Sequence, residues 1–216
     1  MSQTESFAAQ QERHRMRCAL DRAVRVVDYS RTATAGLSEV VADGWHDRAM
    51  NHLNSRFAGH VDFADDSLAG AVLPAGIDGF GAGVRYWIHG DETLGQGELD
   101  KAEAALLDAK DLVAAAFVAF AAELTDARST TSLFRDVHLE EIPEEMACDL
   151  FDVDSREAVT DQVFLDHLLL VGVAISPTAT ERVLALDFAI GADKPTDQLL
   201  VAVWDRNNSV TVHHER

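Results

Sequence analysis

Residues 183–215, VLALDFAIGADKPTDQLLVAVWDRNNSVTVHHE, decide the fold. Together with the preceding stretch LDHLLLVGVAIS they contain apolar, β-type runs that turn-forming residues separate. The runs are 165–176, 182–191, 198–205 and 209–215. Short β-type runs joined by short turns predict an antiparallel meander of three to four strands.

The last turn of this meander is Asp205–Asn208. Asparagine tolerates a positive φ, so the turn predicts a closing hairpin. In the run before it, two sets of residues alternate: Leu200, Ala202 and Trp204 against Leu199, Val201 and Val203. Successive strand residues point to opposite faces of a sheet, and both sets are apolar. This strand is therefore expected to be covered on both sides.

A long amphipathic helix is predicted over residues 98–124. Its apolar residues recur at steps of three and four: Leu99, Ala102, Leu106, Ala109, Val113, Phe117, Phe120 and Leu124. Such a stripe is typical of a central helix that packs in the core or of a dimer seam. We expect the core helix, with a homodimer as the alternative. Shorter elements are expected as helices at 131–138 and 143–151 and strands at 60–63, 68–73 and 83–90.

The N-terminal part differs from the rest in charge. Residues 1–31 carry six basic and four acidic groups, which gives this segment a net charge of 6 − 4 = +2. Amphipathic helices are expected over about 7–28 and 37–57. The chain is thus expected to have a helical N-terminal extension, 1–59, and an α+β domain, 60–216. In that domain the antiparallel β-meander packs on the long central helix.

Composition excludes several classes of protein. The chain has 216 residues, 18 of them basic and 37 acidic, and a net charge of −19. Binding to nucleic acid requires a basic surface, so we expect no nucleic-acid partner. The two cysteines, Cys18 and Cys148, lie far apart and imply no disulfide scaffold. The longest apolar run, 112–122, is well short of the ~20 residues that span a bilayer, so we expect a cytoplasmic protein without membrane contact.

Carboxylates are concentrated in LFRDVHLEEIPEEM, residues 133–146. Four of them form the patch that we expect to bind a basic protein partner: Glu140, Glu141, Glu144 and Glu145. His138 and Glu141 share a helix face, and Glu145 follows one turn later, so these three side chains are also candidate ligands of a divalent cation. Pro143 interrupts a single helix, and a solvated acidic face is the simpler interpretation.

Several motifs of the C-terminal half match a known pattern. They are Leu186–Gly191, Thr196-Asp197 and Asp205–Asn208, with 133–146, 167–177 and VRYWIHG upstream. In these motifs, residues 60–215 resemble a bacterial family, the domain of unknown function numbered two thousand and four. Asn208 stands where that family usually has glycine, and Phe188 is displaced by one position. The resemblance implies an α+β fold and no particular activity, cofactor or catalytic residue.

The motifs of common enzymes are missing from the sequence. It has no G-x-S-x-G or H-E-x-x-H motif, and the glycines at 76, 79, 81 and 83 fit no phosphate-binding loop. We therefore expect a non-enzymatic binding or regulatory module without a cofactor, for example an immunity-type inhibitor of a basic protein. The alternative is a metal-assisted hydrolase that uses His138 and nearby carboxylates.

Overall fold

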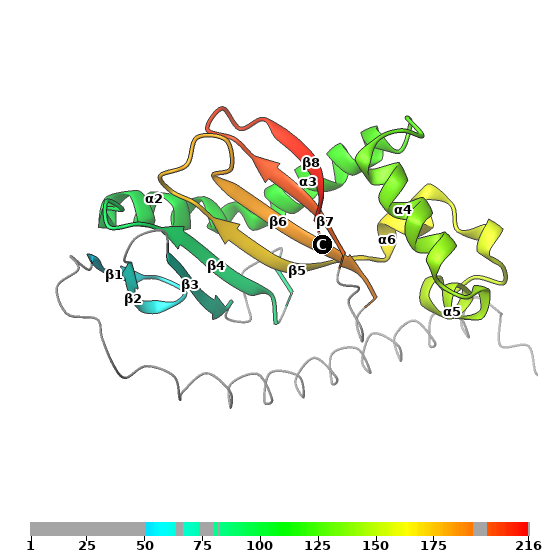
Figure 1. Ribbon diagram of the computed structural model, residues 1–216, viewed down its shortest axis with the longest axis horizontal. Coiled ribbons are helices and arrows are strands. Elements are labelled where there is room, and N and C mark those ends of the chain that lie inside the picture. The colour runs from blue at the N-terminus through cyan, green and yellow to red at the C-terminus, as the bar shows by residue number, and fades with distance from the viewer. Residues whose placement is uncertain (1–50, 64–66, 74–79, 82, 192–197, 216) are drawn as a thin grey trace, which may run out of the picture. The chain divides into compact units, whose positions relative to one another are not determined.

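The computed structural model describes residues 51–63, 67–73, 80–81, 83–191 and 198–215 (Figure 1). The chain divides into two compact units, and all described residues belong to the second, Trp45–Gly191 with Pro195–Arg216. The helix predicted over 7–28, the first part of the helix predicted over 37–57 and most of the glycine-rich segment lie outside the described residues.

A six-stranded sheet of order β3-β4-β5-β6-β7-β8 forms the centre of this unit (Figure 1). Its strands are β3 (Ser67–Val72), β4 (Arg85–Gly90), β5 (Leu168–Ile175), β6 (Leu184–Ile190), β7 (Leu199–Trp204) and β8 (Val210–Glu215). The β5–β8 part is antiparallel throughout, which confirms the predicted meander. The sheet also includes β3 and β4, because β4 pairs with β5 in parallel.

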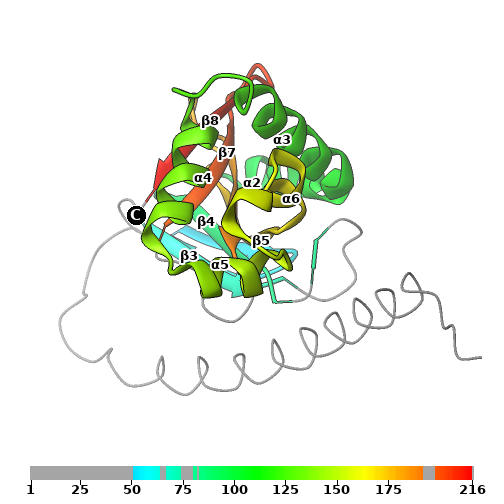
Figure 2. The same ribbon diagram turned by 90° about the vertical axis from the view of Figure 1, so that its right-hand side faces the viewer.

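The helices lie in the connection between β4 and β5. They are α2 (Gln96–Ala105), η1 (Leu106–Asp108), α3 (Ala109–Glu123), α4 (Thr130–Glu141), α5 (Glu144–Phe151), η2 (Arg156–Ala158) and α6 (Asp161–Asp166). A parallel strand pair requires such a long crossover, since a tight turn can join only antiparallel strands. Figures 1 and 2 show α2 and α3 along one face of the sheet and α4, α5 and α6 gathered at one end.

The helix predicted over 98–124 is divided in the structure. The 3-10 turn η1 joins α2 to α3, so the single continuous helix is not confirmed. Leu106 and Ala109 are both fully buried. Residues three apart eclipse in a 3-10 helix, so the tighter turn keeps both on the core side. Leu99, Phe120 and Leu124 are also buried, as the predicted apolar stripe requires.

The main hydrophobic core lies between the helices and the sheet. Phe117 and Phe120 of α3 meet Phe188 of β6 edge to face, with ring centroids 5.5 and 5.1 Å apart. The β7 residues divide as predicted. One set, Leu200, Ala202 and Trp204, belongs to this core. Val201 and Val203 belong to a smaller second cluster, whose described members are all strand residues. Among the described residues, the helices thus pack on the face of the sheet that carries Leu200, Ala202 and Trp204, and none of them contributes to the cluster on the opposite face.

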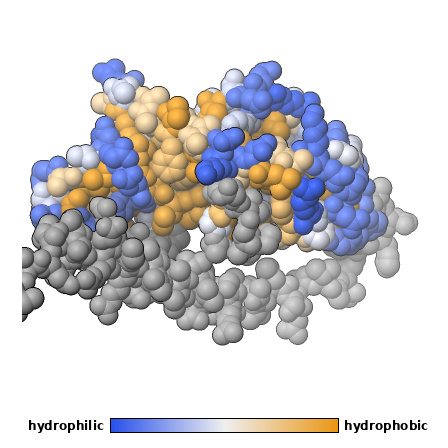
Figure 3. Space-filling view, turned by 180° about the vertical axis from the view of Figure 1, so that it is seen from behind, coloured by the Kyte–Doolittle hydropathy of each residue, from blue (hydrophilic) through white to orange (hydrophobic). Residues whose placement is uncertain are grey.

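The outer side of these helices carries exposed apolar groups. Seen from behind in Figure 3, apolar side chains gather over the middle of the described surface, with hydrophilic ones toward both ends. Leu107 of η1 and Val118 of α3 are 53% and 70% exposed. No described residue covers these two side chains, and the homodimer stays a prediction.

The turn between β7 and β8 is the predicted hairpin. Asn208 adopts a φ of +61°. The Asp205 carboxylate accepts hydrogen bonds from the backbone N–H groups of Asn207 and Ser209, each at 2.8 Å. The bond from Ser209 is the main cause that lowers the pKa of Asp205. One asparagine with positive φ is sufficient, because the aspartate side chain fixes the rest of the turn.

A separate hairpin of β1 (Asn51–Ser55) and β2 (Gly59–Phe63) precedes the sheet. The helix predicted over 37–57 is therefore wrong for residues 51–55. Leu53 lies opposite Val61, and both are buried, so the burial alternates as in a strand. The contact between paired strands thus outweighs the helical spacing of the local sequence. The boundary expected between residues 59 and 60 would fall inside this hairpin.

One buried carboxylate connects this hairpin to the rest of the unit. Glu103 of α2 is 1% exposed. It accepts hydrogen bonds from Ser55 Oγ at 2.5 Å, Tyr86 Oη at 2.9 Å and the backbone N–H of Arg56 at 2.7 Å. Burial, with the nearby Glu103 charge, raises the pKa of Tyr86, so its hydroxyl stays a donor. Glu103 thus joins α2, β4 and the hairpin.

Replacing Phe120 by alanine tests the position of the core. Phe120 is fully buried, and its truncation is expected to lower the free energy of unfolding by about 3–5 kcal/mol. Val118→Ala, on the exposed side of the same helix, is the control and is expected to change it by less than about 0.5 kcal/mol. Urea unfolding measures both values, and equal losses would contradict the assignment of the core face.

Candidate functional site

The four predicted partner-binding carboxylates lie where α4 meets α5, and we call this region the acidic junction. Glu140 and Glu141 end α4, and Glu144 and Glu145 begin α5 (Figure 2). All four are exposed. The helix dipole favours Glu144 and Glu145 at the start of α5, whereas Glu140 and Glu141 lie at the end of α4, where the dipole disfavours negative charge.

Glu144 of the acidic junction and three nearby carboxylates outside it act on Cys148, which lies on α5. Burial raises the pKa of its thiol, and the charges of Glu144, Asp149, Asp154 and Glu157 raise it further. Each of these four carboxylates disfavours the thiolate because like charges repel. The same negative potential attracts a cationic group that approaches from solvent. The four carboxylates are exposed, and their role as a binding surface for a basic partner stays a prediction.

His138 is not part of the exposed acidic surface. It is 3% exposed, and its Nδ1 donates a hydrogen bond to the carbonyl oxygen of Phe134 at 2.8 Å. Its ring packs on the Phe134 ring, with centroids 4.2 Å apart. Glu141 accepts a hydrogen bond from Gln198 at 3.3 Å, and Glu145 is exposed. The structure does not gather the donor atoms of His138, Glu141 and Glu145 around one point within the described residues. Their role as metal ligands stays a prediction.

A shallow hollow of about 430 Å³ lies on the sheet face opposite the main core. Its lining includes Trp87, His89, Ala174, Arg182, Asp187 and Glu215. Sequence reasoning missed this site, although one signal was present. Asp187 interrupts the apolar run LALDFAI, and a carboxylate in the middle of a buried strand needs a special environment.

Asp187 lies beside Gly172 of the neighbouring strand β5. A Cβ atom at position 172 would lie 2.6 Å from Asp187 Oδ2, so a glycine there makes room for the carboxyl group. Burial raises the pKa of Asp187, and the charge of Glu215 raises it further, against the opposing effect of Arg182. Arg182 is itself paired with Glu215 at 2.5 Å. The hollow thus contains a carboxyl group that is protonated more readily than in water.

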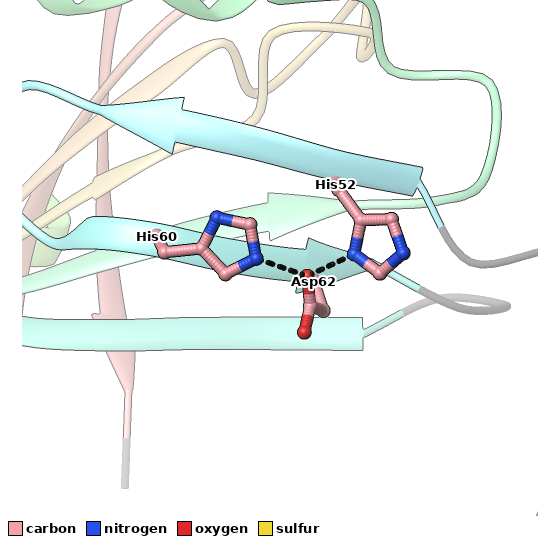
Figure 4. Close-up of side chains that lie close together, drawn as sticks. All are labelled: His52, His60 and Asp62. Carbon is pink, nitrogen blue, oxygen red and sulfur yellow. Dashed lines mark hydrogen bonds and ion pairs between the residues drawn. The ribbon is translucent and has the colours of Figure 1, made fainter.

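A third cluster lies on the β1–β2 hairpin. His52, His60 and Asp62 converge on one point, as Figure 4 shows. Asp62 Oδ1 is 2.6 Å from His52 Nδ1 and 3.1 Å from His60 Nε2. The hydrogen bond to His52 is the main cause that lowers the pKa of Asp62. Sequence reasoning missed this cluster because it placed His52 in a helix, which hid its pairing with Asp62 across two strands.

Comparison with known proteins gives no relative. A scan of family models, a search of curated proteins and a search of solved structures each found no match to the chain. The resemblance of residues 60–215 to the domain of unknown function therefore stays a prediction. Among the described helices, none combines the length and the apolar character that a membrane span requires.

Replacing Asp187 by asparagine tests the electrostatics of the hollow. The pKa of this carboxyl is raised in the folded state above its ordinary value of 3.8. Its charge therefore costs stability, and this cost grows as the pH rises above that value. Asp187→Asn is expected to stabilise the protein at pH 7, and the gain should shrink as the pH falls.

Urea unfolding at several pH values between about 4 and 8 measures this gain. Asp108→Asn, at an exposed carboxylate, is the control, for which no comparable pH-dependent gain is expected. A variant at position 187 that is no more stable than the wild type at neutral pH would refute this description of the hollow.

Proposed function

We propose that the chain is a non-enzymatic binding module that engages a basic protein through the acidic junction. The observation that carries the proposal is the set of four exposed carboxylates at the α4–α5 junction. An immunity-type inhibitor, which covers the basic surface of its target, is one example of this class of protein.

The local structure holds the junction in place. Ala147 and Phe151 of α5 are buried, so the opposite face of the short helix is exposed. Arg156 donates a hydrogen bond from Nη2 to the carbonyl oxygen of Ile142 at 2.7 Å, which links the junction to η2. Asp152 ends α5 in a left-handed conformation with a φ of 51°. A partner that binds here meets a preformed surface, so less conformational entropy is lost on association.

The charge of the whole chain favours the same mode of binding. A net charge of −19 produces a long-range attraction for basic proteins. Such attraction mainly raises the association rate, and salt weakens it because the Debye length falls to ~8 Å at physiological ionic strength. The alternative function, a hydrolase that uses His138, has less support. His138 is buried and its Nδ1 is engaged by the backbone.

The proposal is tested with a fluorescent lysine-rich peptide as a defined basic probe. The four substitutions Glu140→Lys, Glu141→Lys, Glu144→Lys and Glu145→Lys are made together. We expect the association rate at low salt to fall severalfold and the affinity to fall on the order of tenfold or more, because four attractions become repulsions. Stopped-flow fluorescence and anisotropy measure the two quantities.

A matched control separates the junction from net charge alone. It reverses four exposed carboxylates elsewhere: Glu92, Asp108, Asp111 and Glu181. This variant has the same net charge as the first and is expected to bind the probe much more tightly than the first. If the two variants bind equally, net charge alone explains the binding and the junction is not the recognition surface.

A further inference from the structure

The geometry points to a binding site for a zinc-class divalent metal ion on the outer face of the β1–β2 hairpin. The ligands are His52 Nδ1, His60 Nε2 and a carboxylate oxygen of Asp62 (Figure 4). This site lies outside the acidic junction and does not depend on the proposed function.

The strand register brings the three side chains together. His52 on β1 lies directly opposite Asp62 on β2. Side chains of directly opposed residues are close neighbours on the same face of a sheet. His60 precedes Asp62 by two positions on β2, and side chains two apart on a strand share a face. All three side chains therefore point to the same exposed side of the hairpin.

The distances suit a first coordination shell. The two histidine nitrogens lie 2.6 and 3.1 Å from Asp62 Oδ1, and all three donor atoms lie within 4.8 Å of one another. Tetrahedral zinc with bonds of about 2.0–2.1 Å places its ligand atoms ~3.3 Å apart. The two histidine–aspartate separations are shorter than this value, as hydrogen bonds require, so the side chains must rotate slightly apart to admit an ion.

Metal binding would replace the hydrogen bonds that His52 and His60 make to Asp62. A carboxylate oxygen only accepts hydrogen bonds, so each histidine nitrogen that faces Asp62 carries a proton. A metal ion that enters replaces these two protons and is ligated by two imidazole nitrogens and one carboxylate oxygen. When the ion binds a neutral histidine, the displaced proton moves to the other ring nitrogen by exchange with solvent, so no net proton is released. Both histidines are exposed, so solvent reaches them.

The hairpin under the cluster is well supported. Leu53 and Val61 are buried on its inner face. Gln96 of α2 donates to the Asn54 carbonyl oxygen at 2.8 Å and accepts from the Asn54 backbone N–H at 2.9 Å. Ser55 is bound to Glu103. Ligands on a fixed scaffold need little reorganisation when the ion binds, and this raises the affinity of an exposed site.

The ligand set selects among metal ions. Imidazole nitrogen suits zinc, copper and nickel, whereas magnesium and calcium require mostly oxygen ligands. Three protein ligands also leave a coordination position for water or for a donor from a bound molecule. The site should thus bind Zn²⁺ and discriminate against Mg²⁺.

The test is a calorimetric titration of the full chain, without a histidine tag, with Zn²⁺. We expect one equivalent to bind at this site, and His60→Ala and Asp62→Asn to weaken that binding at least about tenfold. Loss of a residue that only orients a ligand already weakens metal binding by about 10–100-fold. His213→Ala, which removes an exposed histidine on β8, is the control and should bind as the wild type does. Circular dichroism establishes that each variant is folded.

The outcomes separate a metal site from a hydrogen-bonded cluster. Zinc binding that is lost in both hairpin variants and kept in His213→Ala supports the site. Equal zinc binding in the wild type and in the hairpin variants overturns it, as does a wild type that binds no zinc at all. Binding of Mg²⁺ with an affinity equal to that of Zn²⁺ would overturn the ligand set.

Discussion

The position of the β1–β2 hairpin in the described unit depends on one buried interaction, the carboxylate of Glu103 with its three donors. An isolated two-stranded hairpin is marginally stable in water, so β1 and β2 need a partner. Their inner side chains join the main core, and Glu103 binds Ser55 and the Arg56 backbone from α2. A carboxylate is buried at high cost unless hydrogen bonds compensate it, and here each donor comes from the hairpin or from Tyr86 of β4. The order of the hairpin, and of the histidine cluster on its outer face, follows from this contact.

The parallel pairing of β4 with β5 is the second constraint. It forces the chain to cross from one end of the sheet to the other, and the crossover contains all the described helices. The helices bury the apolar face of the sheet and carry the acidic junction at one end of the unit (Figure 2). The opposite face retains the half-buried carboxyl of Asp187 in its hollow. The β4–β5 crossover thus places the acidic junction on the helices, whereas the hollow with Asp187, Arg182 and Glu215 lies on the face of the sheet opposite the main core.

The sequence predicted the features that depend on local pattern. The β5–β8 meander, the two faces of β7, the turn at Asp205 and the apolar stripe of α2 and α3 all follow from residue spacing and turn chemistry. The features that it missed depend on contacts between distant residues. His52 meets Asp62 only after two strands pair. Glu103 lies on the same helix face as Leu99 and Leu106, and its partners come from β4 and from the hairpin, which lie far from it in the sequence. Alternation in NHLNS is too short to outweigh the helical spacing of the residues before it.

Amide hydrogen exchange of the Glu103→Gln variant tests the central claim most directly. Glutamine has the size of glutamate, but one of its two terminal atoms is a donor, so it cannot accept hydrogen bonds from both sides of this cluster. The account predicts that amides of β1 and β2 lose protection, whereas amides of β6 and β7 keep theirs, because local opening needs less free energy than global unfolding. Unchanged protection of the hairpin, or an equal loss in all strands, would contradict the claim that Glu103 holds the hairpin in place.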